Sequence, residues 1–337
     1  MASETKTAPT VALSNGVLMP ELALGTAPLS ATAGELPEHK KFVGLLPERV
    51  YRSFAVALDS GLRHVDTALC YNTHKQVGYV LADFFMKGRL TRSDVFITSK
   101  IFHPDNDGFS LDEDTLPANL SGMSPQEVAD ITTQQFERTL REIGVGYIDL
   151  MLLHWPGPRA DSRGGVGTEE ENAANRLAAW QVLEKMYEKG WARAIGVSNF
   201  SEIHLERLKR DGAKVIPMVN QIEASIFLQQ DKIVKYCKEN GILPEAYSPL
   251  GRGVNQVTSN PTIMSIGKKH GKDVGQVAMR YLLQKGYALT FWSGSEERVV
   301  SNQKLYDFNL DEEDMKTLDS LNVPDGSWGL PSPYDIK

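Results

Sequence analysis

His64-Val65-Asp66-Thr67-Ala68-Leu69-Cys70-Tyr71 is the stretch that decides the fold. Its apolar first half is typical of a buried strand, and the ionisable Asp66 and Tyr71 follow close behind it. Residues 95–100 and 148–154 repeat the pattern, because each is an apolar run that ends in one ionisable side chain. In a parallel β/α barrel the carboxyl ends of neighbouring strands meet at one pocket, where catalysis takes place. We therefore expect the polar ends of these three strands to share a site.

Strand and helix signals alternate on both sides of that stretch. An Asn15-Gly16 turn between two short apolar runs predicts a hairpin over residues 11–19. Further strands are expected at 22–26, 194–199, 217–222, 242–248 and 288–293, and helices at 50–60, 75–87, 124–144, 176–189, 229–239 and 273–284. About eight such units close a barrel. The sequence thus predicts an α/β fold, a (β/α)8 TIM barrel with an N-terminal β-hairpin cap and extended loops, 27–48 and 103–122, at the C-terminal face. A doubly wound open sheet is the alternative, although no GxGxxG motif follows the first strand.

Length, charge and cysteine content restrict the class of protein. The 337 residues predict one barrel domain over 11–322, between a flexible tail at 1–10 and a C-terminal tail at 323–337 near the active-site mouth. A net charge of −7 without a basic cluster argues against nucleic acid or an anionic membrane and favours a small-molecule substrate. The two cysteines form neither a disulfide framework nor a zinc motif, and no apolar run reaches the ~18 residues of a membrane helix. We expect a cytoplasmic protein without metal, as a monomer or weak homodimer.

Four side chains at the expected strand ends form a chemically coherent set: Asp66, Tyr71, Lys100 and His154. Taken singly, each is an ordinary polar residue where a strand meets solvent. Taken together, a lysine ammonium lowers the high pKa of a tyrosine (~10 when unperturbed), an aspartate keeps the lysine charged, and a histidine orients a carbonyl oxygen. The set suits proton donation to a carbonyl that receives hydride from a cofactor.

Around these residues the sequence resembles the aldo-keto reductase family. The matching segments are 15–20, 24–26, 63–68 with Tyr71, 77–78, 97–100, 153–156, 195–200, 220–221 and 246–251, and they span nearly the whole chain in the family's order. The resemblance implies a (β/α)8 barrel that binds an extended nicotinamide dinucleotide without a Rossmann domain. It also implies an NAD(P)H-dependent oxidoreductase that reduces an aldehyde or ketone to an alcohol.

The resemblance assigns roles to individual positions. Tyr71 would be the general acid, Asp66 and Lys100 its tuning pair, and His154 the residue that orients the substrate carbonyl. The cofactor-binding positions it implies are Gly25, Thr26, Ser198, Asn199, Gln221, Tyr247, Ser248, Leu250, Gly251, Ser293, Arg298 and Asn302, and the substrate-pocket positions are Ala27, Phe102 and Trp155. From the residues alone, Asn199 and Gln221 are satisfied strand-end amides, and 248–251 is a plain turn.

Two departures from the family pattern bear on the prediction. Trp292 stands where the family has a lysine that grips the 2'-phosphate of NADP, although Ser293 and Arg298 remain. NADPH is the cofactor that the family resemblance implies. Because losing one charge-assisted phosphate contact costs about 1.5–3 kcal/mol of binding free energy, NADH is an alternative. The neighbouring 296–297 acids add negative charge, or stabilise the first turn of a helix capped by Ser293 or Ser295. The second departure is His74, which replaces a common glutamate and is expected to be a surface substitution.

Two other functions fit a barrel of this kind. One is a cofactor-binding regulatory barrel with little turnover, like the channel-associated subunits that resemble this family, and it would copurify with a membrane partner. The other is an isomerase or lyase that does not consume nicotinamide, because a fold does not fix a function.

Overall fold

The computed structural model describes residues 8–27, 47–101, 122–158, 167–251, 255–323 and 332–336. Eight parallel strands form a closed barrel in the order β10-β3-β4-β5-β6-β7-β8-β9. They are β3 Leu22–Gly25, β4 His64–Asp66, β5 Phe96–Ile101, β6 Ile148–Leu153, β7 Ala192–Ser198, β8 Val219–Glu223, β9 Leu243–Tyr247 and β10 Ala288–Phe291. The predicted TIM barrel is confirmed, and the doubly wound open sheet is excluded because β10 pairs with β3.

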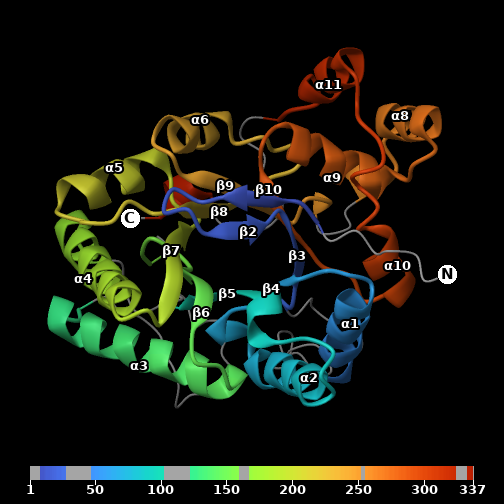
Figure 1. Cartoon of the computed structure of the whole chain (residues 1–337). Coiled ribbons are helices and arrows are strands. Elements are labelled where there is room, and N and C mark those ends of the chain that lie inside the picture. The colour runs from blue at the N-terminus through green and yellow to red at the C-terminus, as the bar shows by residue number, and fades with distance from the viewer. Residues whose placement is uncertain are drawn as a thin grey trace, which may run out of the picture.

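Helices surround the barrel on its outside (Figure 1). They are α1 Pro47–Asp59, α2 His74–Met86, α3 Pro125–Ile143, α4 Glu169–Glu188, α5 Glu202–Arg210, α6 Asp231–Glu239, α7 Asn255–Thr258, α8 Pro261–His270, α9 Val274–Gln284, α10 Glu296–Ser301 and α11 Glu312–Asp319, with short 3-10 turns η2 Leu69–Tyr71, η3 Arg92–Asp94 and η5 Pro333–Asp335. All residues of β4, β5 and β6 are buried. Burial on both faces explains why these strands are apolar runs rather than alternating patterns.

Local sequence signals set the helix ends. Ser124 accepts a hydrogen bond from Glu127 N, Pro125 occupies the first turn, and Gly144 ends α3 in the left-handed region at φ 75°. The helix expected at 176–189 starts earlier, because Thr168 and Glu171 form a capping box at the start of α4. Similarly, α1 begins at Pro47, inside the segment 27–48 that the sequence assigned to a loop.

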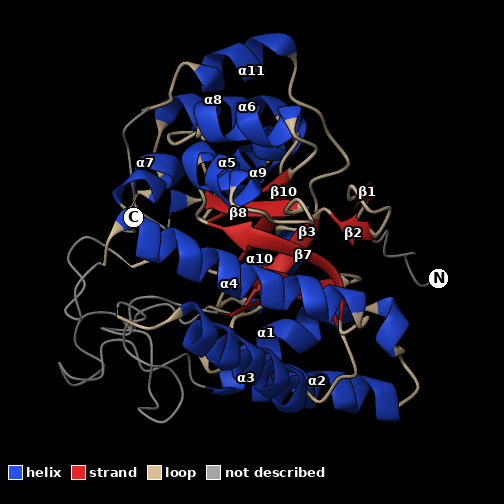
Figure 2. Ribbon diagram, turned by 90° about the vertical axis from the view of Figure 1, so that its left-hand side faces the viewer, coloured by secondary structure: helices blue, strands red, loops and turns tan. Residues whose placement is uncertain are grey.

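The N-terminal hairpin closes one end of the barrel. Strands β1 Thr10–Ala12 and β2 Leu18–Pro20 pair antiparallel, with Val11 opposite Met19. Figure 2 shows the hairpin beside the amino-terminal ends of the barrel strands. The Asn15 side chain donates to the main-chain oxygen of Arg193, at 2.9 Å, and Met19 is fully buried. The amino-terminal end is therefore covered, as the cap prediction required.

Two kinds of feature are absent from the described ranges. No helix there has the length and apolar character needed to cross a bilayer. No cluster of three or more histidine, cysteine or acidic side chains able to hold a metal ion occurs in the same ranges.

Candidate active site

A buried ion pair joins the carboxyl ends of β4 and β5. Lys100 Nζ lies 2.7 Å from both carboxylate oxygens of Asp66 and 3.1 Å from the main-chain oxygen of Thr67. Both residues are almost completely excluded from solvent, at 1% relative exposure for Lys100 and 3% for Asp66. The register places Asp66 opposite Thr98, two residues before Lys100, so the two side chains point into the barrel from adjacent strands. The sequence prediction that these residues meet is confirmed in geometry.

Tyr71 lies beside this pair. It ends the 3-10 turn η2, and Asn72 then reverses the chain in the left-handed region, with φ 54°, before α2 begins. The ammonium of Lys100 is 5.1 Å from the centre of the Tyr71 ring, and the His154 ring stands edge-on to it with centroids 5.7 Å apart. All four side chains of the predicted set thus converge at the carboxyl ends of β4, β5 and β6.

His154 has a neighbour that the sequence did not suggest. The Cys70 sulfur is 3.5 Å from His154 Nδ1. Burial raises the pKa of the Cys70 thiol to about 12, so the thiol keeps its proton at neutral pH. A protonated thiol can donate to Nδ1, and the ring proton then lies on Nε2. Cys70 therefore favours the tautomer that presents a donor on the far side of the ring.

The predicted cofactor amides lie at the ends of β7 and β8. Asn199, in the left-handed region with φ 62°, donates to the main-chain oxygen of His154 at 3.0 Å and to Ser198 Oγ at 3.1 Å. Its side-chain oxygen accepts from the Tyr247 hydroxyl at 2.7 Å. The Ser198 hydroxyl donates to the main-chain oxygen of Gln221 at 2.8 Å. Asn199 is therefore a satisfied strand-end amide whose oxygen keeps one lone pair for another donor.

Gln221 on β8 connects Asp66 of the buried ion pair to Glu245 on β9. Its Nε2 donates to Asp66 Oδ2 and to Glu245 Oε2, both at 2.8 Å. Glu245, on β9, is fully buried, and burial together with the neighbouring Asp66 raises its pKa to about 7. The sequence predicts Glu245 only as part of a strand, because strands buried on both faces show no alternation that would mark an inward-facing acid.

A tight turn follows β9. Ser248 has φ 53°, Gly251 has φ 60°, and Gly251 N donates to Ser248 O at 2.9 Å. Leu250, between them, is half-buried. The segment has the shape of the plain turn that the residues alone indicate.

The segment after β10 resolves the capping alternative. Ser295, not Ser293, is the N-cap of α10, because its hydroxyl accepts from Arg298 N. Ser293 is buried, and its main-chain oxygen accepts from the Ser53 hydroxyl of α1 at 3.1 Å. Arg298 is exposed on α10, whereas Asn302 at the end of that helix is buried. The charged group expected to meet a phosphate is thus accessible to solvent.

The remaining predicted positions are placed in part. Thr26, after β3, donates through Oγ1 to the main-chain oxygen of Asp66 at 3.1 Å, and a Cβ on Gly25 would lie 3.1 Å from Thr290 Oγ1. Ala27 is half-buried and Trp155 is buried. Phe102 lies outside the described residues.

The prediction that His74 is a surface substitution is wrong. His74, the first residue of α2, is 1% exposed, and burial lowers its pKa. Its Nε2 lies 2.9 Å from Ser99 Oγ on β5, and its Nδ1 lies 3.4 Å from Glu142 Oε2 on α3. Ser99 directly precedes Lys100 on β5, so the contact with His74 links the start of α2 to the strand that carries the lysine.

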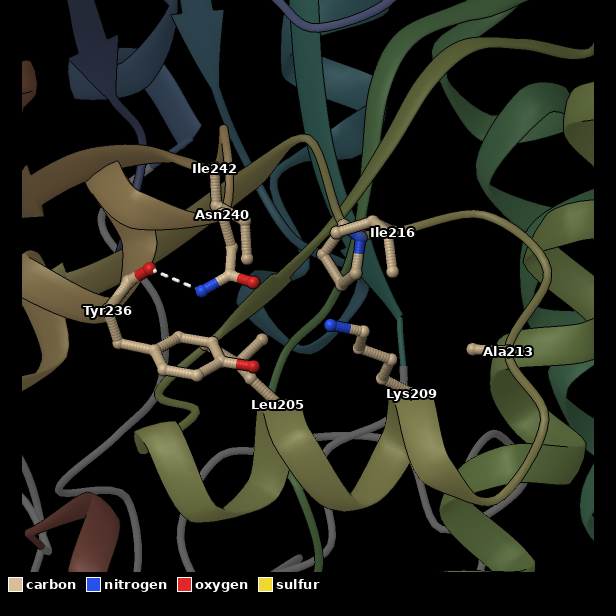
Figure 3. Close-up of a pocket in the computed structure, with 8 residues that line it drawn as sticks. Leu205, Lys209, Ala213, Ile216, Tyr236, Asn240 and Ile242 are labelled. Atoms are coloured by element: carbon tan, nitrogen blue, oxygen red, sulfur yellow. Dashed lines mark hydrogen bonds between the residues drawn. The ribbon is translucent and has the colours of Figure 1, made fainter.

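A shallow recess lies at the other end of the barrel (Figure 3). It is lined by side chains from α5, α6 and the segments before β8 and β9: Leu205, Lys209, Ala213, Ile216, Pro217, Tyr236, Asn240 and Ile242. Its volume of about 10 Å³ is what one water molecule needs. Asn240 Nδ2 donates to the main-chain oxygen of Tyr236 inside it, at 3.0 Å. The recess has neither the size nor the groups of a substrate site.

Comparison with known proteins places the whole barrel in one family. The model of the aldo/keto reductase family matches residues 21–323. The chain belongs to the aldo-keto reductase family. This aldo-keto reductase is 35% identical over 313 residues to a protein named glyoxal reductase in Bacillus subtilis, covering 93% of this chain and 92% of that protein. It is 33% identical over 327 residues to the rat protein named aldo-keto reductase family 1 member C15, covering 93% and 90%.

Solved structures agree with this assignment. An aldo-keto reductase of Bombyx mori in complex with NADP superposes with a TM-score of 0.76 at 28% identity, covering 94% of each chain. A second aldo-keto reductase of Bombyx mori, complexed with NADPH, gives a TM-score of 0.77 at 29% identity, covering 96% of this chain and 90% of that one. NADP(H)-dependent carbonyl reduction on small molecules is the general chemistry of the family, and this aldo-keto reductase is accordingly an oxidoreductase with a nicotinamide cofactor.

Proposed function

We propose that this aldo-keto reductase reduces an aldehyde or ketone to the alcohol, with Tyr71 as the proton donor. The observation that carries the proposal is the Lys100 ammonium, which is held by Asp66 at 2.7 Å and faces the Tyr71 ring at 5.1 Å. A nearby cation favours phenolate over phenol and so makes the tyrosine a stronger acid. The ion pair fixes that cation in a site where its field is weakly screened.

Each residue has a defined task in this mechanism. The His154 ring, with its Nδ1 beside the Cys70 thiol, presents Nε2–H to the carbonyl oxygen and orients it toward Tyr71. Tyr71 gives its proton to that oxygen, and Lys100 stabilises the phenolate that remains. When bound, the nicotinamide cofactor supplies the hydride.

The residues present fit a nicotinamide. Gln221 Oε1 accepts no hydrogen bond from any described residue, and Asn199 Oδ1 keeps a lone pair, so both can accept from a carboxamide NH2. Tyr247 would lie against the ring, the turn 248–251 would contact the pyrophosphate, and Gly25 and Thr26 would line the site. Ser293, Arg298 and Asn302 would hold the adenosine end. Arg298 supports NADPH and the missing lysine at Trp292 weakens it, so NADH is the second candidate.

Ala27, Phe102 and Trp155 are proposed to form an apolar wall for the substrate. We also propose a cytoplasmic location, which is supported by the two buried, unpaired cysteines Cys70 and Cys237.

Fluorescence titration with NADPH and with NADH, followed by cofactor oxidation with aromatic, aliphatic and sugar aldehydes, tests the proposal. We expect saturable quenching, with oxidation only when a carbonyl compound is present. Binding without oxidation would favour the regulatory barrel instead. Failure to bind either cofactor would refute the reductase.

A further inference from the structure

The inference concerns the carboxyl group of Glu245 inside the barrel. Glu245 is fully buried, and its Oε1 has no hydrogen-bond partner among the described residues. Its Oε2 accepts one hydrogen bond, from Gln221 Nε2 at 2.8 Å. A buried carboxyl with one oxygen unsatisfied is costly, and an apolar side chain of similar volume would be cheaper for the fold. The carboxyl therefore calls for an explanation other than stability.

The position of Glu245 also works against its ionised form. Asp66 carries a second carboxylate in the same network, and the single ammonium of Lys100 already makes two close contacts with Asp66. Burial is the main cause of the raised pKa of Glu245, and the charge of Asp66 adds to it. Retaining an acid at this point thus costs free energy twice, once through desolvation and once through repulsion.

The hydrogen bond to Glu245 bears on the orientation of the Gln221 side-chain amide. Asp66 is paired with an ammonium and offers only acceptor atoms, so the nitrogen end of the amide must face it. Glu245 accepts from the same nitrogen. Both N–H groups of Gln221 are then used inside the barrel. Rotation of the amide would turn its oxygen toward Asp66, which would remove two hydrogen bonds and bring like partial charges together.

We propose that Glu245 is a positioning residue that locks the Gln221 amide with its oxygen facing the cofactor site, where it accepts from an amide N–H of the nicotinamide carboxamide. The inference rests on the proposed reductase function and adds to it a residue that does not itself touch the cofactor. It requires Glu245 to act only on the nicotinamide half of the dinucleotide.

The test compares two ligands and two variants. The ligands are NADPH and 2'-phospho-ADP-ribose, which shares the adenosine end but lacks nicotinamide. In Glu245→Met one of the two anchors of the amide is lost. We expect its Kd for NADPH to rise by up to roughly tenfold, the upper end of the range for one ordinary hydrogen bond, while its Kd for 2'-phospho-ADP-ribose stays within about twofold of wild type. Glu245→Gln keeps an oxygen acceptor for Gln221 and should bind both ligands like wild type.

Stability gives a second readout. A residue needed for packing would lower Tm when replaced, whereas in Glu245→Met the relief of a buried, half-satisfied carboxyl offsets the loss of the Gln221 hydrogen bond, so Tm should stay close to that of wild type. The combination of a near-wild-type Tm with selective loss of NADPH binding is the expected result. An equal fold-change in Kd for both ligands, including no change in either, would overturn the proposal. An unfolded Glu245→Met variant would also overturn it. Wild-type protein that binds neither NADPH nor NADH would instead refute the reductase function, on which the inference depends.

Discussion

Replacing Lys100 by methionine should destabilise the barrel strongly. The substitution keeps the length of the side chain but removes three polar contacts of Nζ, two with the Asp66 carboxylate at 2.7 Å and one with the Thr67 oxygen at 3.1 Å. Asp66, at 3% exposure, would keep only the Gln221 amide as a side-chain partner among the described residues. Breaking a buried ion pair from one side costs about 3–5 kcal/mol.

That cost translates into a measurable shift of Tm. With an unfolding entropy of about 2.1 cal/mol/K per residue, a chain of 337 residues has roughly 0.7 kcal/mol/K, so the loss lowers Tm by roughly 4–7 °C. Thermal unfolding followed at pH 7 by both circular dichroism and tryptophan fluorescence measures it. The matched control is the double variant Asp66→Asn/Lys100→Met, which removes both charges and should recover most of the lost Tm. If the Tm loss of the double variant equals the sum of the losses measured for Lys100→Met and for Asp66→Asn alone, the two charges are not coupled and the reasoning is refuted.

Four other outcomes follow from the structure. Tyr71→Phe should abolish carbonyl turnover while cofactor binding stays within about twofold, since only the hydroxyl is lost; wild-type turnover would show that the proton donor is another group. Arg298→Ala should weaken NADPH roughly tenfold and NADH little, by loss of one charge-assisted contact, and equal losses in a fluorescence titration would mean that Arg298 does not reach the 2'-phosphate. Cys70→Val should lower kcat/KM roughly 2- to 10-fold, with Cys70→Ser near wild type; equal activity of both would remove the thiol from the orientation of the histidine. Burial lowers the pKa of His64 to about 4 from 6.5, so between these pH values the unfolded chain binds more protons than the folded one. The free energy of unfolding therefore falls as pH drops from 6.5 to 4, by roughly 3 kcal/mol for this residue. His64→Asn should flatten that decline in urea titrations at several pH values, and an unchanged slope would contradict the assignment.

Much of this architecture could be predicted from the sequence because parallel barrel strands are apolar and end abruptly. Asp66, Lys100 and His154 each close such a run, and barrel geometry brings strand ends together. Helix α3 was equally predictable from the sequence, since Ser124 and Gly144 mark its two ends through local backbone chemistry. These signals depend on neighbours within a few residues along the chain.

The residues that were missed depend on partners far along the chain. Glu245 meets Gln221 across adjacent strands, and nothing in a strand buried on both faces reports which side chains point inward. The burial of His74 cannot be read from the sequence around it, because its partner Ser99 lies on another element. The start of α4 is a different case, since the Thr168 and Glu171 capping box is a local signal that follows a glycine-rich segment typical of a loop.

The hairpin that covers the amino-terminal end of the barrel has a kinetic consequence. Met19 of β2 is buried and Asn15 is bonded to Arg193, so the side-chain-filled barrel is covered at its amino-terminal end. Under the proposed reductase function, the cofactor and the carbonyl compound would therefore both approach the site from the carboxyl end. The reactant that lies deeper there would enter first, and its product would leave last.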